Sequence, residues 1–189
     1  MKFKLALLLS CSILFTTQAK EFPLNHENLE VRGLNYVKKA TKQISYKRFT
    51  SEVLKMPMKQ SGINAANASN SAGGTIEFRT NSRHIKLTFI SAGLEFKNKP
   101  QYLFPFSVLV DDKVILEKSW WKPKTPEMKL SFKAPHEGFV SYRITLPLFT
   151  LSKLIKFELD DDATLEALPA KELTYISLGD SISHGMGQK

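Results

Sequence analysis

The feature that most constrains the fold is an alternation of apolar and polar residues that begins after Gly74. An alternation of period two lines up one face of an extended strand, whereas a helix would need a period of 3.6 residues. Turn residues interrupt the pattern every ten or so residues, as in antiparallel sandwiches. The apolar runs are 76–78, 85–89, 106–110, 114–116, 128–132, 139–146 and 154–159. The pattern predicts a mainly β chain of about seven strands, folded as an antiparallel, jelly-roll-like β-sandwich.

The segment from Lys20 to Ala72 shows no clear period. Its glycines, asparagines and serines are typical of turns and irregular backbone. We expect one short helix and one edge strand there. The length of 189 residues suits one domain of ordinary size with a small addition, and it excludes two complete domains.

The first residues have the three parts of a secretory signal peptide. The basic segment Met1–Lys4 precedes a mainly apolar run, Leu5–Phe15, and Thr17–Ala19 offers small residues at a cleavage position. The apolar run is shorter than the roughly 20 residues that a membrane-spanning helix needs. We therefore expect residues 1–19 to be removed and the chain to be exported to the periplasm or the extracellular space, without a transmembrane segment.

Cys11 is the only cysteine, and it lies inside this leader. The exported chain therefore has no disulfide, although its compartment would allow one. A second interpretation takes Leu8–Cys11 as a lipoprotein cleavage box, which would anchor the chain through a lipidated Cys11. The apolar run continues beyond the cysteine, and this favours the cleaved leader.

The chain is basic, with 27 Lys and Arg against 18 Asp and Glu and a formal charge of +9. Loss of Lys2 and Lys4 with the leader leaves +7. The remaining basic residues are scattered along the chain, which is typical of a solvated surface. Attraction to an acidic polysaccharide or an anionic lipid is the sharper alternative, and nucleic acid is not expected as a partner of an exported chain.

The pattern changes in the last 20 or so residues, where an apolar run, Leu173–Leu178, leads directly into Gly179-Asp180-Ser181. A strand that ends in a glycine-flanked turn is how a parallel sheet presents a nucleophile at its carboxyl edge. A helix after the turn would supply backbone N–H groups to a developing oxyanion. Ser181 is therefore the candidate nucleophile. The alternative is an ordinary strand-turn-helix in which an Asp or Ser is only a helix cap.

Gly179-Asp180-Ser181-Ile182, followed by Gly185, resembles the first conserved block of the SGNH (GDSL-type) hydrolases. Members of that family are esterases that use this serine as the nucleophile and its backbone N–H as an oxyanion donor. Earlier segments are similar to the β-sandwich that precedes the catalytic domain in one group of bacterial SGNH esterases. These segments are Tyr46–Phe49, Ser69–Gly73, Phe78–Ser82 and Tyr142–Phe149. The resemblance implies a serine ester hydrolase, and a carbohydrate deacylase is one such enzyme.

The same resemblance shows what this chain lacks. The family takes its general base from an Asp-x-x-His late in the domain and its other oxyanion donors, a Gly and an Asn, from later blocks, whereas this chain ends four residues after Gly185. We therefore expect a truncated chain with three parts: the leader 1–19, an accessory β-sandwich 20–168, and the start of an SGNH domain 169–189. Alone it should not turn over an ester, because triad members act as a unit.

The histidines of this chain offer no replacement for the missing base. His184 is too close to Ser181 in the sequence to reach its hydroxyl, and His26 and His84 have no carboxylate at a fixed offset. We expect His136 to be a turn residue. Since no cluster of histidine and acidic residues has the spacing of a metal site, we expect neither a metal nor a cofactor.

The competing class of function is a non-catalytic carbohydrate-binding β-sandwich module, in which the Ser181 turn is vestigial. Trp120 and Trp121 are its candidate glycan contacts, because adjacent residues of a strand point to opposite faces and one indole should stay exposed among lysines. Alternatively, the outer Trp binds no glycan and only covers nearby prolines. The partner expected for the esterase is an acylated small molecule or polysaccharide.

Overall fold

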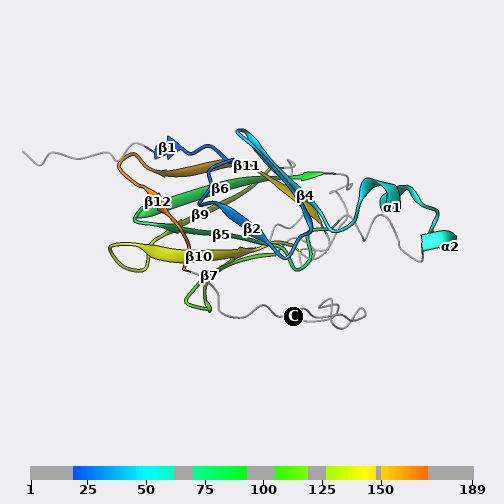
Figure 1. Ribbon diagram of the computed structural model, residues 1–189. Helices are drawn as coiled ribbons and strands as arrows, with labels where there is room; N and C mark the ends of the chain where they lie inside the picture. Colours follow the sequence, from blue (N-terminus) through cyan, green and yellow to red (C-terminus); the bar gives the residue numbers. More distant parts are fainter. Residues whose placement is uncertain (1–18, 62–69, 93–104, 119–126, 148–149, 170–189) are drawn as a thin grey trace, which may run out of the picture.

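Two antiparallel β-sheets that face each other make up most of the fold (Figure 1). The computed structural model describes residues 19–61, 70–92, 105–118, 127–147 and 150–169. Strands that are apolar on one face bury that face against a second sheet, which is the packing of a β-sandwich. The predicted mainly β sandwich is therefore confirmed.

The first sheet, called sheet A, has the strand order β3-β4-β11-β6-β9, and β1 pairs with one end of β11. Its strands are β1 (Ala19–Glu21), β3 (Tyr36–Ala40), β4 (Gln43–Lys47), β6 (His84–Ala92), β9 (Glu127–Lys133) and β11 (Leu151–Asp160). The long strand β11 lies inside the sheet and shifts its register against β6 between Leu154 and Lys156. This irregularity keeps both Leu154 and Phe157 on the core side.

The second sheet, called sheet B, has the strand order β12-β5-β10-β7-β8, and β2 pairs with β5. Its strands are β2 (Glu30–Arg32), β5 (Thr75–Thr80), β7 (Phe106–Val110), β8 (Lys113–Lys118), β10 (Val140–Thr145) and β12 (Leu165–Glu166). The hairpin between β7 and β8 turns at Asp111 and Asp112, whose φ angles are 49° and 58°. Two successive positive φ angles are the pattern of a tight two-residue hairpin turn, and Asp tolerates that region better than most residues.

The seven runs that alternate in the sequence form strands β5 to β11, as predicted. The expectation for the segment before them is wrong, because it contains four short strands, β1 to β4, and two helices, α1 (Ser51–Lys55) and α2 (Met58–Ser61). These strands add to sheets that the later strands build, so pairing with distant partners makes β1, β2 and β4 extended, and β3 pairs with β4.

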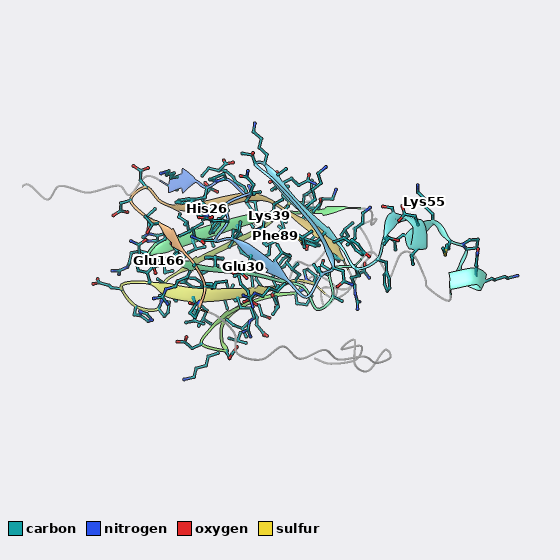
Figure 2. The ribbon with its side chains drawn as sticks, viewed as in Figure 1. His26, Glu30, Lys39, Lys55, Phe89 and Glu166 are labelled. Atoms are coloured by element: carbon teal, nitrogen blue, oxygen red, sulfur yellow. The ribbon has the colours of Figure 1, made fainter. Side chains whose placement is uncertain are left out.

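The two helices stand away from the sandwich, beyond β4 (Figures 1 and 2). Thr50 caps α1, since its hydroxyl accepts a hydrogen bond from the backbone N–H of Val53 at 3.2 Å. None of the residues of α1 is buried. Among the described residues, no helix is both long enough and apolar enough to cross a membrane.

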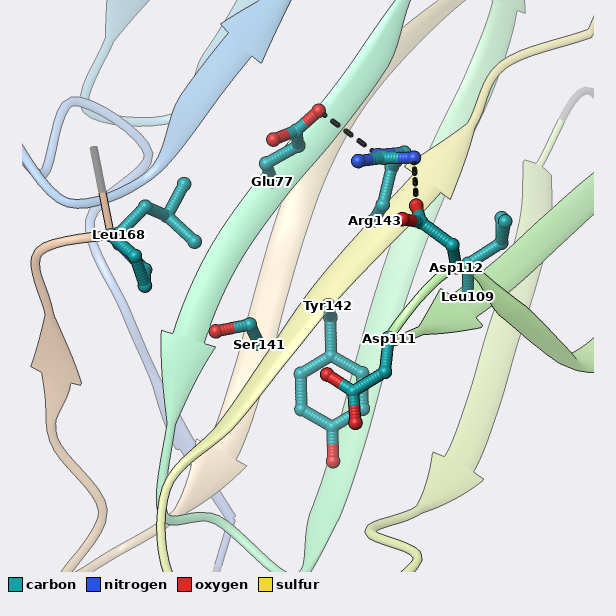
Figure 3. Close-up of a pocket in the computed structure, with 9 residues that line it drawn as sticks. Glu77, Leu109, Asp111, Asp112, Ser141, Tyr142, Arg143 and Leu168 are labelled. Atoms are coloured by element: carbon teal, nitrogen blue, oxygen red, sulfur yellow. Dashed lines mark hydrogen bonds and ion pairs between the residues drawn. The ribbon is translucent and has the colours of Figure 1, made fainter. Parts of the chain in front are cut away.

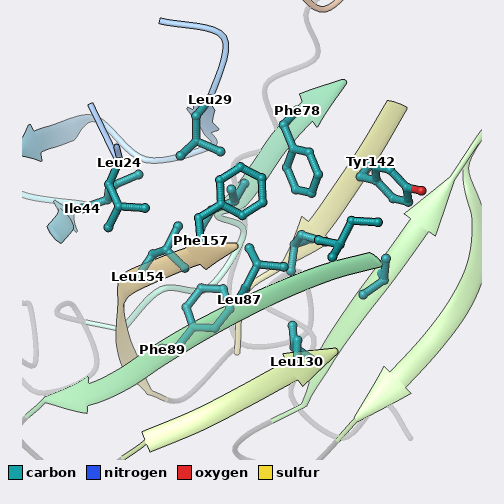
Figure 4. Close-up of a cluster of buried hydrophobic side chains, with 14 of the residues drawn as sticks. Leu24, Leu29, Ile44, Phe78, Leu87, Phe89, Leu130, Tyr142, Leu154 and Phe157 are labelled. Atoms are coloured by element: carbon teal, nitrogen blue, oxygen red, sulfur yellow. The ribbon is translucent and has the colours of Figure 1, made fainter. Parts of the chain in front are cut away.

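The core between the sheets is rich in aromatic rings (Figure 4). Phe78 of sheet B stacks on Tyr142 with 5.2 Å between ring centroids and meets Phe157 of sheet A at 4.8 Å. Phe89 and Phe106 join the sheets in the same way at 4.5 Å. Such ring pairs stabilise a core beyond the area that they bury, by about 1 kcal/mol each.

Two buried tyrosine hydroxyls have opposite environments. The hydroxyl of Tyr46 lies 2.9 Å from Oγ of Ser152, and burial raises its pKa above the ordinary value. The hydroxyl of Tyr142 has no hydrogen-bond partner among the described residues, and burial raises its pKa to about 12. A buried hydroxyl without a partner lowers stability, whereas a satisfied one contributes to it.

The two tyrosines make a matched pair for a stability test. We expect Tyr142→Phe to leave the free energy of unfolding unchanged or to raise it by up to about 1 kcal/mol, because no hydrogen bond is lost. We expect Tyr46→Phe to lower it by about 1–2 kcal/mol, because the buried hydrogen bond between Tyr46 and Ser152 is lost. Urea unfolding of both variants measures the difference. Equal losses in the two variants would show that the Tyr142 hydroxyl is hydrogen-bonded.

Candidate functional site

The residues that the sequence singles out for catalysis lie outside the described part of the chain. These are Ser181 with Gly179, Asp180 and Gly185. Trp120 and Trp121, the candidate glycan contacts, also lie outside it. Their predicted roles therefore stay predictions. The structure does describe where the chain leaves the sandwich on its way to that turn.

The chain leaves over the outer face of sheet B, next to a hollow of about 260 Å³ (Figure 3). Leu168 and Pro169, the last described residues, form one wall. Strands β5, β7 and β10 and the hairpin turn of β7 and β8 supply the rest of the lining. The remaining lining residues are Glu77, Leu109, Asp111, Asp112, Ser141, Tyr142 and Arg143.

A buried carboxylate, that of Glu77, is the central polar group of this hollow. The register of β5 and β10 places Arg143 directly opposite Glu77, and the Arg143 Nε lies 3.3 Å from Glu77 Oε1. On the other side, Nε of Arg32 lies 3.6 Å from Oε2. The hydroxyl of Thr75 donates to Oε1 at 3.0 Å. Two guanidinium groups and a hydroxyl thus compensate the cost of burying this charge.

Arg143 extends the network to the hairpin turn. Its Nη1 lies 2.5 Å from Oδ1 of Asp112 (Figure 3). One guanidinium therefore links two carboxylates, and its position is fixed on both sides. Glu77, Arg143 and Asp112 thus satisfy each other, while Asp111 and Ser141 also line the hollow. It is a fixed polar surface beside the segment that carries the predicted nucleophile.

A second polar cluster surrounds Asp160, at the end of β11. The ring Nδ1 of His84 lies 3.1 Å from Oδ1 of this buried carboxylate. Its Oδ2 accepts hydrogen bonds from the backbone N–H groups of Arg83 at 2.7 Å and His84 at 2.9 Å. Oγ of Ser82 lies 3.1 Å from the same oxygen. The cluster attaches the turn at residues 82–84 to β11. This turn connects β5 in sheet B to β6 in sheet A.

The pKa of Asp160 reflects two opposed effects. Burial pushes it upward, but the hydrogen bonds from His84, Arg83 and Ser82 stabilise the charged form more strongly, so the pKa lies below the ordinary value. A carboxylate with several N–H and O–H donors favours its ionised state. Folding therefore gains stability from this group wherever it is charged.

The cluster contains a serine, a histidine and an aspartate, but it is not a catalytic triad. In a triad the imidazole lies between the serine and the carboxylate. Here the Ser82 hydroxyl contacts the carboxylate and, at 2.7 Å, the backbone oxygen of His84. We therefore assign the cluster to structure. The carboxylate partner of His84, Asp160, comes from 76 residues away, so no fixed offset in the sequence indicates it.

The other two described histidines have local contacts. Nδ1 of His26 accepts a hydrogen bond from the backbone N–H of Asn28 at 3.2 Å. His136 lies in the exposed loop between β9 and β10, with Nδ1 2.9 Å from the backbone oxygen of Glu137, so the expectation of a turn residue is confirmed. Within the described residues, no three His, Cys, Asp or Glu side chains are grouped so that they could hold a metal ion.

Comparison with known proteins finds solved structures that are similar in fold. No family model and no curated protein matches the chain. A salicylyl-acyltransferase from a tetracycline biosynthetic pathway is similar over 81% of this chain, with a TM-score of 0.64 and 16% identity. A GDSL-like lipase from Bacteroides ovatus is similar over 79%, with a TM-score of 0.55 and 18% identity. A family two carbohydrate esterase from Cellvibrio japonicus is similar over 91%, with a TM-score of 0.56 and 11% identity.

This chain spans 42%, 43% and 44% of the lengths of these three proteins, in the same order. At such low identity the likeness shows a shared β-sandwich fold. The names of the three neighbours cover an acyltransferase, a lipase and a carbohydrate esterase. In each of them, more than half of the chain has no counterpart here.

The Asp160 cluster makes the stability depend on pH. We expect Asp160→Asn to lower the free energy of unfolding at neutral pH by about 1–2 kcal/mol, because its donors then meet a neutral acceptor. The folded-state pKa is lowered, so the contribution is present above the unfolded value of about 4 and is lost as pH falls through the folded value. The difference in the free energy of unfolding between the unchanged protein and Asp160→Asn should therefore narrow below about pH 4.

Urea unfolding between neutral and acidic pH tests this expectation. Asp161→Asn, at the exposed neighbouring position, is the matched control and should follow the unchanged protein at every pH. If Asp160→Asn lowers the free energy of unfolding by the same amount down to the most acidic pH, the ionised carboxylate of Asp160 is not the cause of the loss.

Proposed function

We propose that this chain is the accessory β-sandwich and first catalytic block of a secreted SGNH-type ester hydrolase, with acylated carbohydrate as its substrate class. The observation that carries the proposal is the order of two features. A sandwich similar in fold to proteins named as lipase and carbohydrate esterase is followed, after Pro169, by an apolar run and Gly179-Asp180-Ser181-Ile182. Each feature alone is common, and their succession points to one family.

In this proposal Ser181 attacks the ester carbonyl, and its own backbone N–H stabilises the oxyanion that forms. Gly179 allows the tight turn, while Asp180 and Gly185 complete the motif. The general base and the other oxyanion donors come from sequence beyond this chain. The hollow around Glu77 is a polar surface on which the start of the catalytic domain can rest.

The proposal includes the boundaries expected from the sequence: leader 1–19, sandwich 20–168 and catalytic start 169–189. Two observations support them. Strand β1 begins at Ala19, so removal of residues 1–19 leaves Lys20 and Glu21 still paired with β11. Strand β12 ends at Glu166, and the chain has left sheet B by Pro169. An exported enzyme of this kind meets polysaccharides, which fits the substrate class.

The alternative function is a carbohydrate-binding module without catalysis. The basic charge of the chain and the adjacent Trp120 and Trp121 favour it. The two functions differ in what they require, because an esterase needs Ser181 whereas a binding module does not. They can therefore be separated by experiment.

The esterase proposal is tested with an aryl acetate and two proteins. The chain from Lys20 to Lys189 should show no Ser181-dependent hydrolysis, whereas the protein extended through the coding sequence downstream of Lys189 should hydrolyse the ester. In the extended protein, Ser181→Ala should lower the rate by about 10⁴-fold or more.

Ser183→Ala, in the same turn, is the matched control and should keep most of the activity. Two results would overturn the proposal: an extended protein that is inactive although folded, or one whose activity survives Ser181→Ala. Serine-dependent hydrolysis by the chain that ends at Lys189 would instead show that the base lies within it.

The binding alternative is tested through the two tryptophans. We expect one Trp→Ala variant to lose about 3–5 kcal/mol of stability, because the sequence predicts that one of the two indoles packs in the core. If the sandwich binds glycan there, the other variant should keep its melting curve and lose retention on polysaccharide. If both variants unfold the domain and neither changes retention, these residues give the binding module no support.

A further inference from the structure

The outer faces of the two sheets differ in charge. On sheet B the arginines are paired with carboxylates, as in Arg143 with Glu77 and Arg79 with Glu166 at 3.2 Å. On sheet A, alternate residues of β3, β4, β6, β9 and β11 point away from the core and include seven lysines. They are Lys38, Lys47, Lys86, Lys129, Lys133, Lys153 and Lys156. The acidic residues on the same face are fewer. They are Glu21, Glu127, Glu158 and Asp160.

A hollow of about 390 Å³ lies at one end of this lysine face. Strands β1, β6, β9 and β11 line it, so its walls are regular sheet and are held in place by the ladder hydrogen bonds. The lining residues are Ala19, His84, Lys86, Ser131, Phe132, Lys133, Glu158 and Asp160. A concave site with a few convergent polar groups on rigid strands is the general form of a ligand site.

Two lysines, Lys86 and Lys133, and two carboxylates, Glu158 and Asp160, line this hollow, and Glu158 lies directly opposite Lys86 on β11. Lys86 and Lys133 are exposed and make no ion pair with any described residue. The carboxylate of Glu158 already has a partner, since Nζ of Lys156 lies 3.0 Å away. The carboxylate of Asp160 is occupied by the crossover turn. Two ammonium groups are therefore available to an anion from solvent.

His84 adds a second kind of contact. The side chain is 45% exposed, and Asp160 holds its Nδ1 at 3.1 Å. In the neutral ring this hydrogen bond places the proton on Nδ1 and leaves Nε2 as an acceptor. The ring orientation is thus fixed, and Nε2 can accept a hydrogen bond from a hydroxyl group. Ser131, directly opposite Lys86 on β9, offers a further hydroxyl.

We propose that this hollow binds a carboxylate-bearing sugar unit of an acidic polysaccharide. Lys86 and Lys133 contact the carboxylate, and Nε2 of His84 accepts a hydrogen bond from a sugar hydroxyl. Lys129 and Lys156 are paired with Glu127 and Glu158, and Lys38, Lys47 and Lys153 continue the positive face along the sheet, so a polymer with regularly spaced carboxylates gains more contacts than a single sugar. This site needs no catalytic residue and goes beyond the proposed esterase activity.

Binding to polygalacturonate tests the proposal, with its methyl-esterified form as the uncharged comparison. We expect binding of the acidic polymer that weakens with salt and little binding of the ester form. Lys86→Gln with Lys133→Gln should weaken binding of the acidic polymer about tenfold, the sum of two exposed ion pairs. The melting temperature should stay unchanged, because both side chains are exposed.

The matched control is Lys55→Gln with Lys59→Gln, which removes the same charge from α1 and α2, away from the sandwich (Figure 2). We expect this variant to bind almost as well as the unchanged protein. Equal weakening in both double variants would overturn the proposal, since it would show attraction by net charge alone. Equal binding of the ester form would do the same.

Vesicles that contain an anionic phospholipid form the last arm. If the protein binds the vesicles through Lys86 and Lys133 and does not bind polygalacturonate, the proposal of a polysaccharide ligand is wrong. That result would indicate that the hollow binds a membrane surface. None of these readouts uses ester hydrolysis, so failure of this site and failure of the proposed esterase are distinguishable.

Discussion

Strand β11 is the element on which the rest of the sandwich depends. It pairs with β1, β4 and β6, and its core-side residues Leu154, Phe157 and Leu159 are buried. At its end, Asp160 fastens the turn through which the chain passes from sheet B to sheet A. One strand thus fixes both the order of sheet A and the connection between the sheets. Loss of the Asp160 carboxylate would leave the backbone N–H groups of Arg83 and His84 without this acceptor, which is why a single charge matters for the fold.

The sequence predicts the part of this fold that local alternation encodes. Apart from the edge strand β8, strands β5 to β11 each bury one face and therefore alternate visibly, as Ile85, Leu87 and Phe89 do in β6. Strands β1 to β4 are short, and only some of their residues reach the core, so their sequences carry no strong period. For β1, β2 and β4 the extended form is imposed by partners more than 40 residues away, such as β5 for β2, while β3 pairs with its neighbour β4. Local pattern cannot show a pairing of that kind.

The polar clusters illustrate the same limit. His84 and Asp160 have no fixed offset and meet only because β6 lies beside β11. Glu77 and Arg143 meet because β5 and β10 are in register. By contrast, Gly179-Asp180-Ser181-Ile182 is contiguous, so a nucleophile turn can be proposed from sequence while the groups that would serve it cannot. Contiguous motifs are open to sequence reasoning, and sites assembled across sheets require the fold.

The separation of the two outer faces has a consequence for how the proposed activities would work together. The chain leaves the sandwich over sheet B, at Leu168 and Pro169, whereas the lysine face belongs to sheet A. The hollow at Lys86 and Lys133 therefore opens on the sheet opposite to the one over which the chain leaves. The lysine face would act on the polymer as a whole. It would hold a polysaccharide near the enzyme and raise the local concentration of its ester groups, while the choice of ester would be made in the catalytic domain.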